Sequence, residues 1–201
     1  MSGPASGGGL AGRRVLVLVG GSVAAFKAAD VVALLRVGGA EVRCAMTPAA
    51  TRFLGPLTLR ALSGNPVVTD LLTPPERGPG MEHLTLSGWA ELQVAVAASA
   101  NLIARLALGL ADDAVTATVL ACRAPLLLAP AMETAMWEHP ATREHVTTLR
   151  SRGVILVGPV AGRLASGREG EGRMAEPAVI VEAAAALLAE GGGAARCGPV
   201  G

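Results

Sequence analysis

Glycine and hydroxyl residues follow two apolar segments near the start of the chain. Gly21 and Ser22 come after the apolar residues 15–19, and Thr47 ends the segment 40–47. Backbone N–H groups at the beginning of a helix favour a bound phosphate. The first loop lacks the third glycine of the dinucleotide pattern and the Lys-Ser/Thr end of a Walker loop. The first loop therefore indicates a phosphate site of another kind, and an ordinary tight turn is its alternative. Thr47 could contact the same phosphate, and an ordinary helix cap is its alternative.

Two further apolar segments end in polar or bulky residues. The segment 91–99 runs into Ser99 and Asn101. Buried polar side chains need hydrogen-bond partners, so we expect these two to face a ligand rich in donors and acceptors. The segment 124–131 is followed by side chains that can form an apolar slot for a flat ring. Alternatively, these side chains belong to the start of a helix and pack on its neighbour. These side chains are Met132, Glu133, Met136 and Trp137.

His83 is the best candidate for a general base, because an imidazole titrates near neutral pH. It lies in a long predicted loop, residues 67–90, so the alternative is that His83 is a solvated surface side chain without a catalytic role. His139 and His145 lie in a charged helical segment that we expect at the surface. The three histidines and three cysteines have no metal-ligand spacing, so we expect no metal.

The segment 165–174 contains three glycines, two arginines, two glutamates and Ser166. It could be a phosphate-binding loop, a linker or a flap over an active site. Arg163 and Arg173 are candidate contacts for an anionic substrate at this segment, since a guanidinium matches a carboxylate in a bidentate way.

The elements that must position these residues alternate along the chain. Short apolar segments typical of buried strands are expected at 13–20, 40–47, 91–99, 124–131 and 154–160, with helical spacing between them. This alternation indicates a parallel sheet covered by helices on both faces. In such a doubly wound sandwich, ligands bind at the carboxyl ends of the strands. We expect every motif described above to lie at such an end.

Composition argues against several functions. Of the 201 residues 51% are hydrophobic, and the formal net charge of +1 gives no reason to expect nucleic acid or an anionic membrane as partner. The apolar runs are too short to span a bilayer. The N-terminus has no secretory pattern, so we expect a cytoplasmic protein without structural disulfides. Residues 1–12 are expected to be disordered and 191–201 to form a flexible tail, on either side of one domain, 13–190.

Six segments in unbroken order between Arg13 and Ala189 resemble one family. They are GGSVAAFK, MTPAATRF, SANLIARLALGLADD, APAMETAMW, HPATREHVTTLRSRGV and ASGREGEGRM. The chain is similar to the homo-oligomeric flavin-containing cysteine decarboxylases, which comprise phosphopantothenoylcysteine decarboxylases and the peptidyl-cysteine decarboxylases of lantibiotic-type pathways. The resemblance implies a flavodoxin-like (Rossmann-type) three-layer α/β sandwich with FMN at the strand ends. It also implies a homotrimer, or a homododecamer built from trimers, with the active site at a subunit interface.

Carried over residue by residue, the resemblance assigns roles to the motif positions. His83 matches the family's catalytic histidine, and residues 160–174 match a flap over the substrate. The implied FMN contacts are Gly21, Ser22, Thr47, Ala98, Ser99 and Asn101. The implied substrate contacts are Met132, Glu133, Met136, Arg163, Ser166 and Arg173.

Two positions depart from the family pattern near the implied cofactor and substrate. Ala97 replaces a proline, which we expect to matter little to hydrogen bonding. Glu133 replaces an asparagine whose amide faces the substrate carboxylate, and two carboxylates repel each other unless one is protonated or a cation intervenes. Three accounts are open: Glu133 is protonated, an arginine binds the substrate carboxylate, or Glu133 points elsewhere and the substrate is not a cysteine. The candidate arginines are Arg143, Arg163 and Arg173.

Ser166 replaces the flap cysteine that, in the pantothenate branch, protonates an enethiolate so that reduced flavin can return its electrons. A hydroxyl is a far weaker acid than a thiol, whose reference pKa is about 8.5. We therefore expect the reaction to stop at the enethiol. The resulting prediction is oxidative decarboxylation of the C-terminal cysteine of a ribosomally made precursor peptide, which would be the partner, as a step towards an aminovinyl-cysteine ring. The alternatives are phosphopantothenoylcysteine decarboxylase of coenzyme A biosynthesis and a non-catalytic FMN-binding regulatory subunit.

Overall fold

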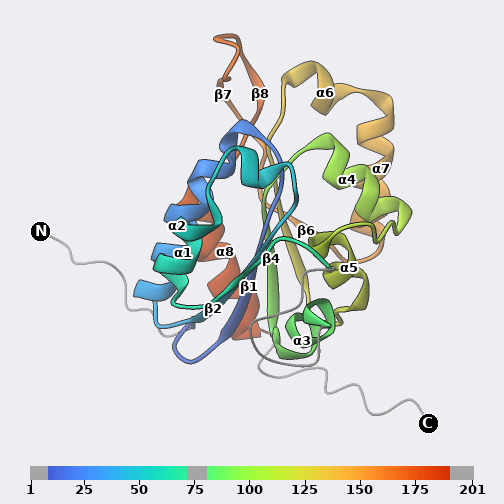
Figure 1. The fold of residues 1–201 in the computed structure, drawn as a ribbon. Helices are drawn as coiled ribbons and strands as arrows, with labels where there is room; N and C mark the ends of the chain where they lie inside the picture. The colour runs from blue at the N-terminus through green and yellow to red at the C-terminus, as the bar shows by residue number, and fades with distance from the viewer. Residues whose placement is uncertain (1–8, 72–80, 191–201) are drawn as a thin grey trace, which may run out of the picture.

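The computed structural model describes residues 9–71 and 81–190, which form a sheet with helices on both faces and a projecting hairpin (Figure 1). Six parallel strands lie in the order β3-β2-β1-β4-β5-β6. They are β1 (Arg14–Val19), β2 (Glu41–Met46), β3 (Val67–Val68), β4 (Leu92–Ala98), β5 (Leu126–Pro130) and β6 (Ile155–Leu156). Without the two-residue edge strand β3, the remaining order corresponds to the flavodoxin-like arrangement.

Helices α1 and α8 cover one face of the sheet, and α3, α4, α5 and α7 cover the other. The helices are α1 (Ala28–Val37), α2 (Pro56–Ser63), α3 (Glu82–Trp89), α4 (Ala100–Leu108), α5 (Ala114–Ala121), α6 (Thr134–Glu138), α7 (Pro140–Ser151) and α8 (Pro177–Glu190), with the short 3-10 helices η1 (Val23–Lys27) and η2 (Ala50–Arg52). The sandwich expected from the sequence is confirmed.

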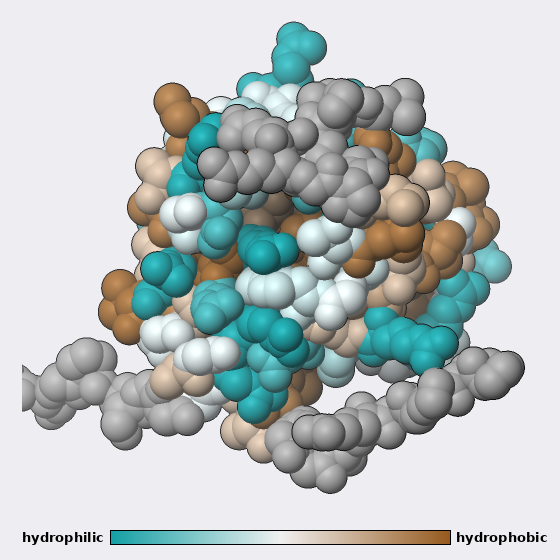
Figure 2. Space-filling view, turned by 60° about the horizontal axis from the view of Figure 1, so that its bottom comes forward, coloured by the Kyte–Doolittle hydropathy of each residue, from teal (hydrophilic) through white to brown (hydrophobic). Residues whose placement is uncertain are grey.

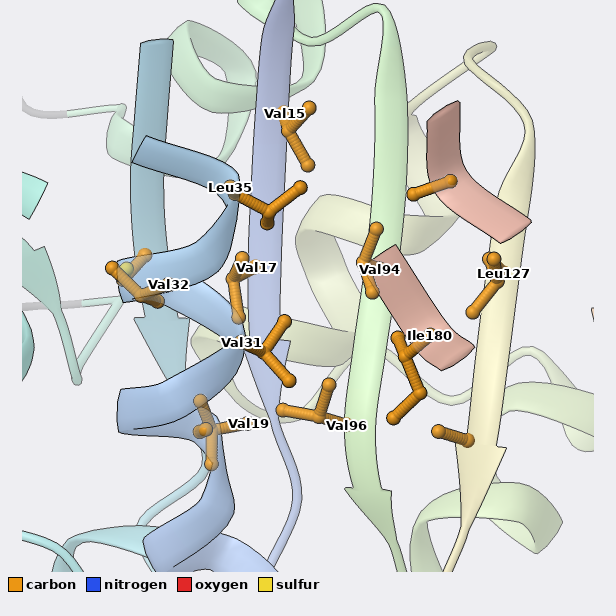
Figure 3. Packing of buried hydrophobic residues seen from close by; sticks show 14 of the residues in the cluster. Val15, Val17, Val19, Val31, Val32, Leu35, Val94, Val96, Leu127 and Ile180 are labelled. Atoms are coloured by element: carbon orange, nitrogen blue, oxygen red, sulfur yellow. The ribbon is translucent and has the colours of Figure 1, made fainter. Parts of the chain in front are cut away.

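Alternation along β1 explains why both faces are covered. Val15, Val17 and Val19 point into the first core, whereas Leu16 and Leu18 point into the second, and all five are fully buried. Figure 3 shows the valines of β1 beside side chains of α1, and Ile180 of α8 beside Val94 and Val96 of β4. Successive side chains of a strand face opposite sides, so a strand that is apolar at every position requires cover on both.

The segment 67–90, expected to be a loop, contains regular structure at both of its ends. It begins with β3 and ends with α3, and residues 72–80 lie outside the described part. Helix α3 buries only Leu86 and contains Gly88, a weak helix former. Its apolar spacing therefore carried too little signal for a helix to be expected.

Three other expectations were wrong in extent. Helical spacing was expected to follow the segment 40–47, but within residues 48–54 only the three-residue η2 forms. The strand expected at 154–160 pairs with β5 only at Ile155 and Leu156. The flap, expected as a glycine-rich loop, is an antiparallel hairpin of β7 (Val160–Arg163) and β8 (Glu169–Arg173).

The two ends of the domain also bear on the expected boundaries. Leu10 lies within the segment expected to be disordered, but it is buried in the first core, and Gly12 donates to the carbonyl of Gly39 over 2.9 Å. Residues 1–8 and the expected tail, 191–201, lie outside the described part. No helix within the described ranges is long and apolar enough to cross a membrane. Figure 2 turns forward the end of the molecule that bears α3, where hydrophilic and hydrophobic residues are interspersed.

Candidate functional site

A cavity of about 470 Å³ opens at the carboxyl edge of the sheet. It lies among the loops that follow β1, β2 and β4. The chain leaves β1 towards one face of the sheet and leaves β4 towards the other, and this switch point is where doubly wound sheets bind ligands. The cavity is lined by Gly21, Thr47, Pro48, Ala49, Ser99, Asn101, Leu102, Arg105, Asp112, Asp113 and Met136.

The structure brings together residues that the sequence places in four separate motifs. Gly21, Thr47, Ser99 and Asn101 all line this cavity, together with Met136 from the expected substrate slot. Two further expected cofactor contacts, Ser22 and Ala98, are adjacent in sequence to the lining residues Gly21 and Ser99. Their roles as ligands of a cofactor stay predictions.

The loop after β1 has no room for side chains at its two glycines. A Cβ on Gly20 would overlap the carbonyl oxygen of Ala97, and a Cβ on Gly21 would overlap the Cβ of Ala49. Ser22 follows as the N-cap of η1, yet its hydroxyl makes no capping bond, is buried and has no partner among the described residues. A buried hydroxyl of this kind normally has a partner, so it is suited to a ligand.

Two expected ligand contacts also act as local caps. The Thr47 hydroxyl accepts a bond from the N–H of Ala50 at 3.1 Å, and the Ser99 hydroxyl accepts from the N–H of Leu102 at 3.3 Å. Ser99 is half-buried and Asn101 is exposed. The expectation that burial forces these two side chains onto a ligand was therefore wrong in its premise, although both line the cavity.

Ala97 has an unusual backbone conformation beside this cavity. Its φ of 54° lies in the left-handed region, and the pairing of β4 with β5 shifts register between Ala95 and Ala98. Its N–H donates to the sulfur of Met174 over 3.2 Å. Proline has no N–H and a fixed negative φ. The expectation that alanine for proline leaves hydrogen bonding unchanged was thus wrong here.

A charged network on the cavity wall was not expected from the sequence. Arg105 donates to Asp113 at 2.9 Å and to Asp112 through Nε, also at 2.9 Å, and it contacts Thr116 at 3.2 Å. The hydrogen bond from Arg105 lowers the pKa of Asp112. Asp113 also caps α5 by exchanging bonds with Thr116. The acidic pair directly before a helix was the available signal.

The flap lies against the loop that joins β5 to α6. Met132 donates its N–H to the carbonyl of Gly172 over 2.9 Å. A Cβ on Gly172 would overlap the Met132 carbonyl oxygen, and one on Gly170 would overlap the Thr134 hydroxyl. These glycines therefore permit close packing of the flap on this loop. The contact places Met132 and Glu133 beside the flap.

The flap tip carries Ser166. Ser166 is exposed, and its hydroxyl accepts a weak bond from the N–H of Arg168 at 3.4 Å. Gly167 forms the turn with φ of 85° and open space around its Cα. No described residue other than the flap's own backbone holds the Ser166 hydroxyl in place.

The three candidate arginines differ in their partners. Arg143 stacks over the Trp137 ring and lies 3.8 Å from Glu171, and Arg173 pairs with Glu176. Arg163 is exposed on β7 and has no ion-pair partner within the described residues. Arg163 is therefore the candidate whose charge is not already neutralised by a neighbour.

His83 lies at the opposite end of the sheet from the cavity. It is on α3, which ends three residues before β4 begins, whereas the cavity lies beyond the carboxyl ends of the strands (Figure 1). The expectation that every motif lies at the carboxyl edge was therefore wrong for His83. Its Nδ1 atom is buried and has no partner among the described residues.

Metal ligands and reactive thiols do not gather in the described part of the chain. Within residues 9–71 and 81–190 no three acidic, histidine or cysteine side chains are grouped as a metal site. Cys44 is buried, which raises its pKa to about 12, and Cys122 is half-buried. Both thiols are free.

Comparison with known proteins places this site in a family. Residues 5–189 match the family model described as Flavoprotein. The chain is 44% identical over 174 residues to the coenzyme A biosynthesis bifunctional protein CoaBC of Haemophilus influenzae, covering 87% of this chain and 43% of that protein. The chain thus spans less than half the length of this curated relative.

Two solved structures match almost along their whole length. The FMN-dependent cysteine decarboxylase SpaF is 36% identical with a TM-score of 0.78, covering 91% of this chain and 99% of that one. A cysteine-to-serine mutant of PPC decarboxylase complexed with pantothenoylaminoethenethiol is 35% identical with a TM-score of 0.79, covering 89% and 99%.

These matches define the class of the protein. The chain belongs to the flavoprotein family. Within that family it belongs to the FMN-dependent cysteine decarboxylases. The resemblance noted in the sequence is thereby confirmed.

Proposed function

We propose that the chain binds FMN in the cavity at the β1–β4 edge and removes the carboxylate of a cysteine at the end of its substrate. The observation that carries the proposal is the convergence of Gly21, Thr47, Ser99 and Asn101 on one cavity, in a chain related over nearly its full length to an FMN-dependent cysteine decarboxylase. When bound, FMN supplies a two-electron acceptor for the thiol of the substrate.

The residues at the cavity fit a phosphate-bearing cofactor. The two glycines after β1 let this loop pack closely on Ala97 and Ala49, and the buried Ser22 hydroxyl at the start of η1 lacks a partner among the described residues. Asp112 and Asp113 line the same cavity and share the single cation Arg105, so this wall keeps an excess of negative charge that disfavours a phosphate. Gly21 and Ser22 would therefore hold the phosphate, and Met136 would be available to the ring of the cofactor.

The flap and the β5–α6 loop would hold the substrate. Met132 and Glu133 lie beside the flap foot, and Ser166 lies at its tip. Closure of such a site excludes water and strengthens its electrostatic interactions. His83 lies at the far end of the same chain, so we infer that a second copy supplies it, in the homotrimer or homododecamer that the sequence led us to expect.

The relatives favour phosphopantothenoylcysteine as the substrate. Bifunctional CoaBC is 44% identical to this chain, against 36% for SpaF, and a PPC decarboxylase superposes with a TM-score of 0.79. The C-terminal cysteine of a precursor peptide, which the sequence led us to expect first, is therefore the second candidate.

Ser166 is the observation that favours the peptide. The PPC decarboxylase with a cysteine-to-serine mutation carries an enethiol, pantothenoylaminoethenethiol. This chain has serine by nature at the flap position where we expect the family cysteine, which suits an enzyme whose product is the enethiol itself.

A single assay tests the function and separates the substrates. Purified protein is incubated with FMN and either phosphopantothenoylcysteine or a peptide ending in cysteine, and products are identified by mass spectrometry. We expect loss of CO2 together with two hydrogens, and bleaching of the yellow flavin in the absence of oxygen. Turnover of the peptide alone would reverse the order of the two candidates. FMN binding without turnover of either substrate would instead support a non-catalytic FMN-binding subunit.

A further inference from the structure

Glu176 joins the foot of the flap to the end of the cofactor loop. One carboxylate oxygen, Oε2, lies 3.2 Å from the Lys27 ammonium, which ends η1 directly after the Gly21–Ser22 turn. The other oxygen, Oε1, pairs with the guanidinium of Arg173, the last residue of β8. The Lys27 side chain is 17% exposed and that of Glu176 is 50% exposed, so the pair is shielded from solvent on the lysine side only.

A second, apolar route joins the same two elements. Met174, next to Arg173, is 1% exposed, and its sulfur accepts the bond from the Ala97 N–H. The carbonyl oxygen of Ala97 in turn lies against Gly20, so closely that no Cβ would fit. Packed elements with a shared contact transmit small displacements, because a dense interior cannot deform freely.

We propose that Glu176 is a positioning residue that couples the occupancy of the cofactor loop to the order of the flap. The inference rests on the proposed function, since FMN is the ligand of that loop. An FMN phosphate held at Gly21 and Ser22 would fix the position of η1 and of Lys27 at its end. Through its ion pairs, Lys27 would then fix Glu176, and Glu176 would fix Arg173 at the foot of β8. By reciprocity, an ordered flap then strengthens FMN binding by the same factor.

The sign of the effect distinguishes coupling from simple electrostatics. Removing a negative charge near the cofactor loop should strengthen the binding of an anionic phosphate if Coulomb interaction alone acts. If the carboxylate instead fixes the loop and the flap foot together, Glu176→Gln weakens FMN binding. The two explanations therefore predict opposite changes in the same measured constant.

The test measures FMN binding and flap protection in the full chain. FMN affinity is obtained from quenching of flavin fluorescence, and hydrogen exchange of residues 164–173 is measured with and without FMN. Glu176→Gln is expected to weaken FMN binding about fivefold and to remove most of the protection that FMN confers on the flap. The matched control is Glu171→Gln, which changes a glutamate of β8 that pairs with Arg143 and not with Lys27. It is expected to leave FMN affinity within about twofold.

A second variant keeps the inference falsifiable if Glu176→Gln is poorly folded. Lys27→Met breaks the same link from the other side, and the double variant should then lose no more coupling than either single variant. Tighter or unchanged FMN binding in Glu176→Gln, with normal FMN-dependent flap protection, overturns the inference alone. Wild-type protein that binds no FMN overturns the proposed function and the inference with it.

Discussion

Gly172 and Met132 are joined so closely that the flap and the β5–α6 loop act as one packed unit. The N–H of Met132 donates to the Gly172 carbonyl at 2.9 Å, and the Gly172 Cα lies against the Met132 carbonyl oxygen with no space for a side chain. Gly172 also has a φ of 154°, at the edge of the region that side chains disfavour. The foot of the flap is therefore packed tightly against the β5–α6 loop.

Gly172→Ala should separate the flap from this loop. The added methyl group overlaps backbone, which cannot rotate away, so we expect a loss of about 1–3 kcal/mol in the free energy of unfolding. Urea unfolding followed by circular dichroism measures it. Gly55→Ala is the control, because Gly55 has a negative φ and open space. Equal stability of the two variants would contradict the packing described here.

The same residues show how far sequence reasoning can reach. The covered parallel sheet and the edge at which the cavity lies could be predicted, because uniformly apolar strands such as β1 and β4 and the loops after them carry local signals. The role of Gly172 could not, since a glycine required for close packing looks like one required for flexibility. The position of His83 depends on the path of residues 67–90, whose weak periodicity hid α3.

Ser166→Cys should extend the reaction beyond the enethiol. A thiol is a far stronger acid than a hydroxyl and can protonate the enethiolate. We expect a product that has lost CO2 but retained the two hydrogens, which mass spectrometry distinguishes from the wild-type product. Ser166→Ala is the control and should leave the enethiol as product. A wild-type enzyme that already yields the saturated thiol would show that Ser166 does not decide where the reaction stops.

Arg163→Gln should weaken substrate binding with little change in kcat. Arg163 is the candidate arginine with no ion-pair partner in the described ranges, so its charge is available to a substrate anion. Loss of one charge-assisted hydrogen bond raises KM about tenfold. Arg168→Gln, at the exposed tip of the same hairpin, serves as the control. If KM rises instead in Arg173→Gln, the pairing of Arg173 with Glu176 does not keep it from the substrate.

Ala97→Pro should destabilise the chain even though we expect a proline there in relatives. Proline cannot reach a φ of 54° and removes the N–H that Met174 accepts. We expect a loss of more than about 1 kcal/mol in the free energy of unfolding. Ala97→Gly, which tolerates this φ, should stay within about 1 kcal/mol of wild type. A proline variant as stable as wild type would show that this part of β4 readily adopts another backbone path.

The ion pairs of Glu176 should give the stability of the chain a recognisable dependence on acid. The hydrogen bond and charge of Lys27 lower the pKa of Glu176 below its ordinary value of 4.5. A carboxyl whose pKa is lower in the folded state stabilises that state above the unfolded pKa, and the contribution is lost as pH falls through the folded pKa. Stability should thus be insensitive to this group at neutral pH and decline below about pH 4.5. The measurement compares urea midpoints of wild type and Glu176→Gln from neutral to acid pH. The midpoint of wild type should be higher at neutral pH, and the two midpoints should converge in acid. The pKa of Asp112 is also lowered by its hydrogen bond to Arg105, but this carboxylate is present in both proteins and does not affect their difference. A difference that remains in acid would therefore come from a change in the variant other than loss of the Glu176 charge. A constant difference across the whole range would show that the carboxylate charge of Glu176 does not stabilise the fold.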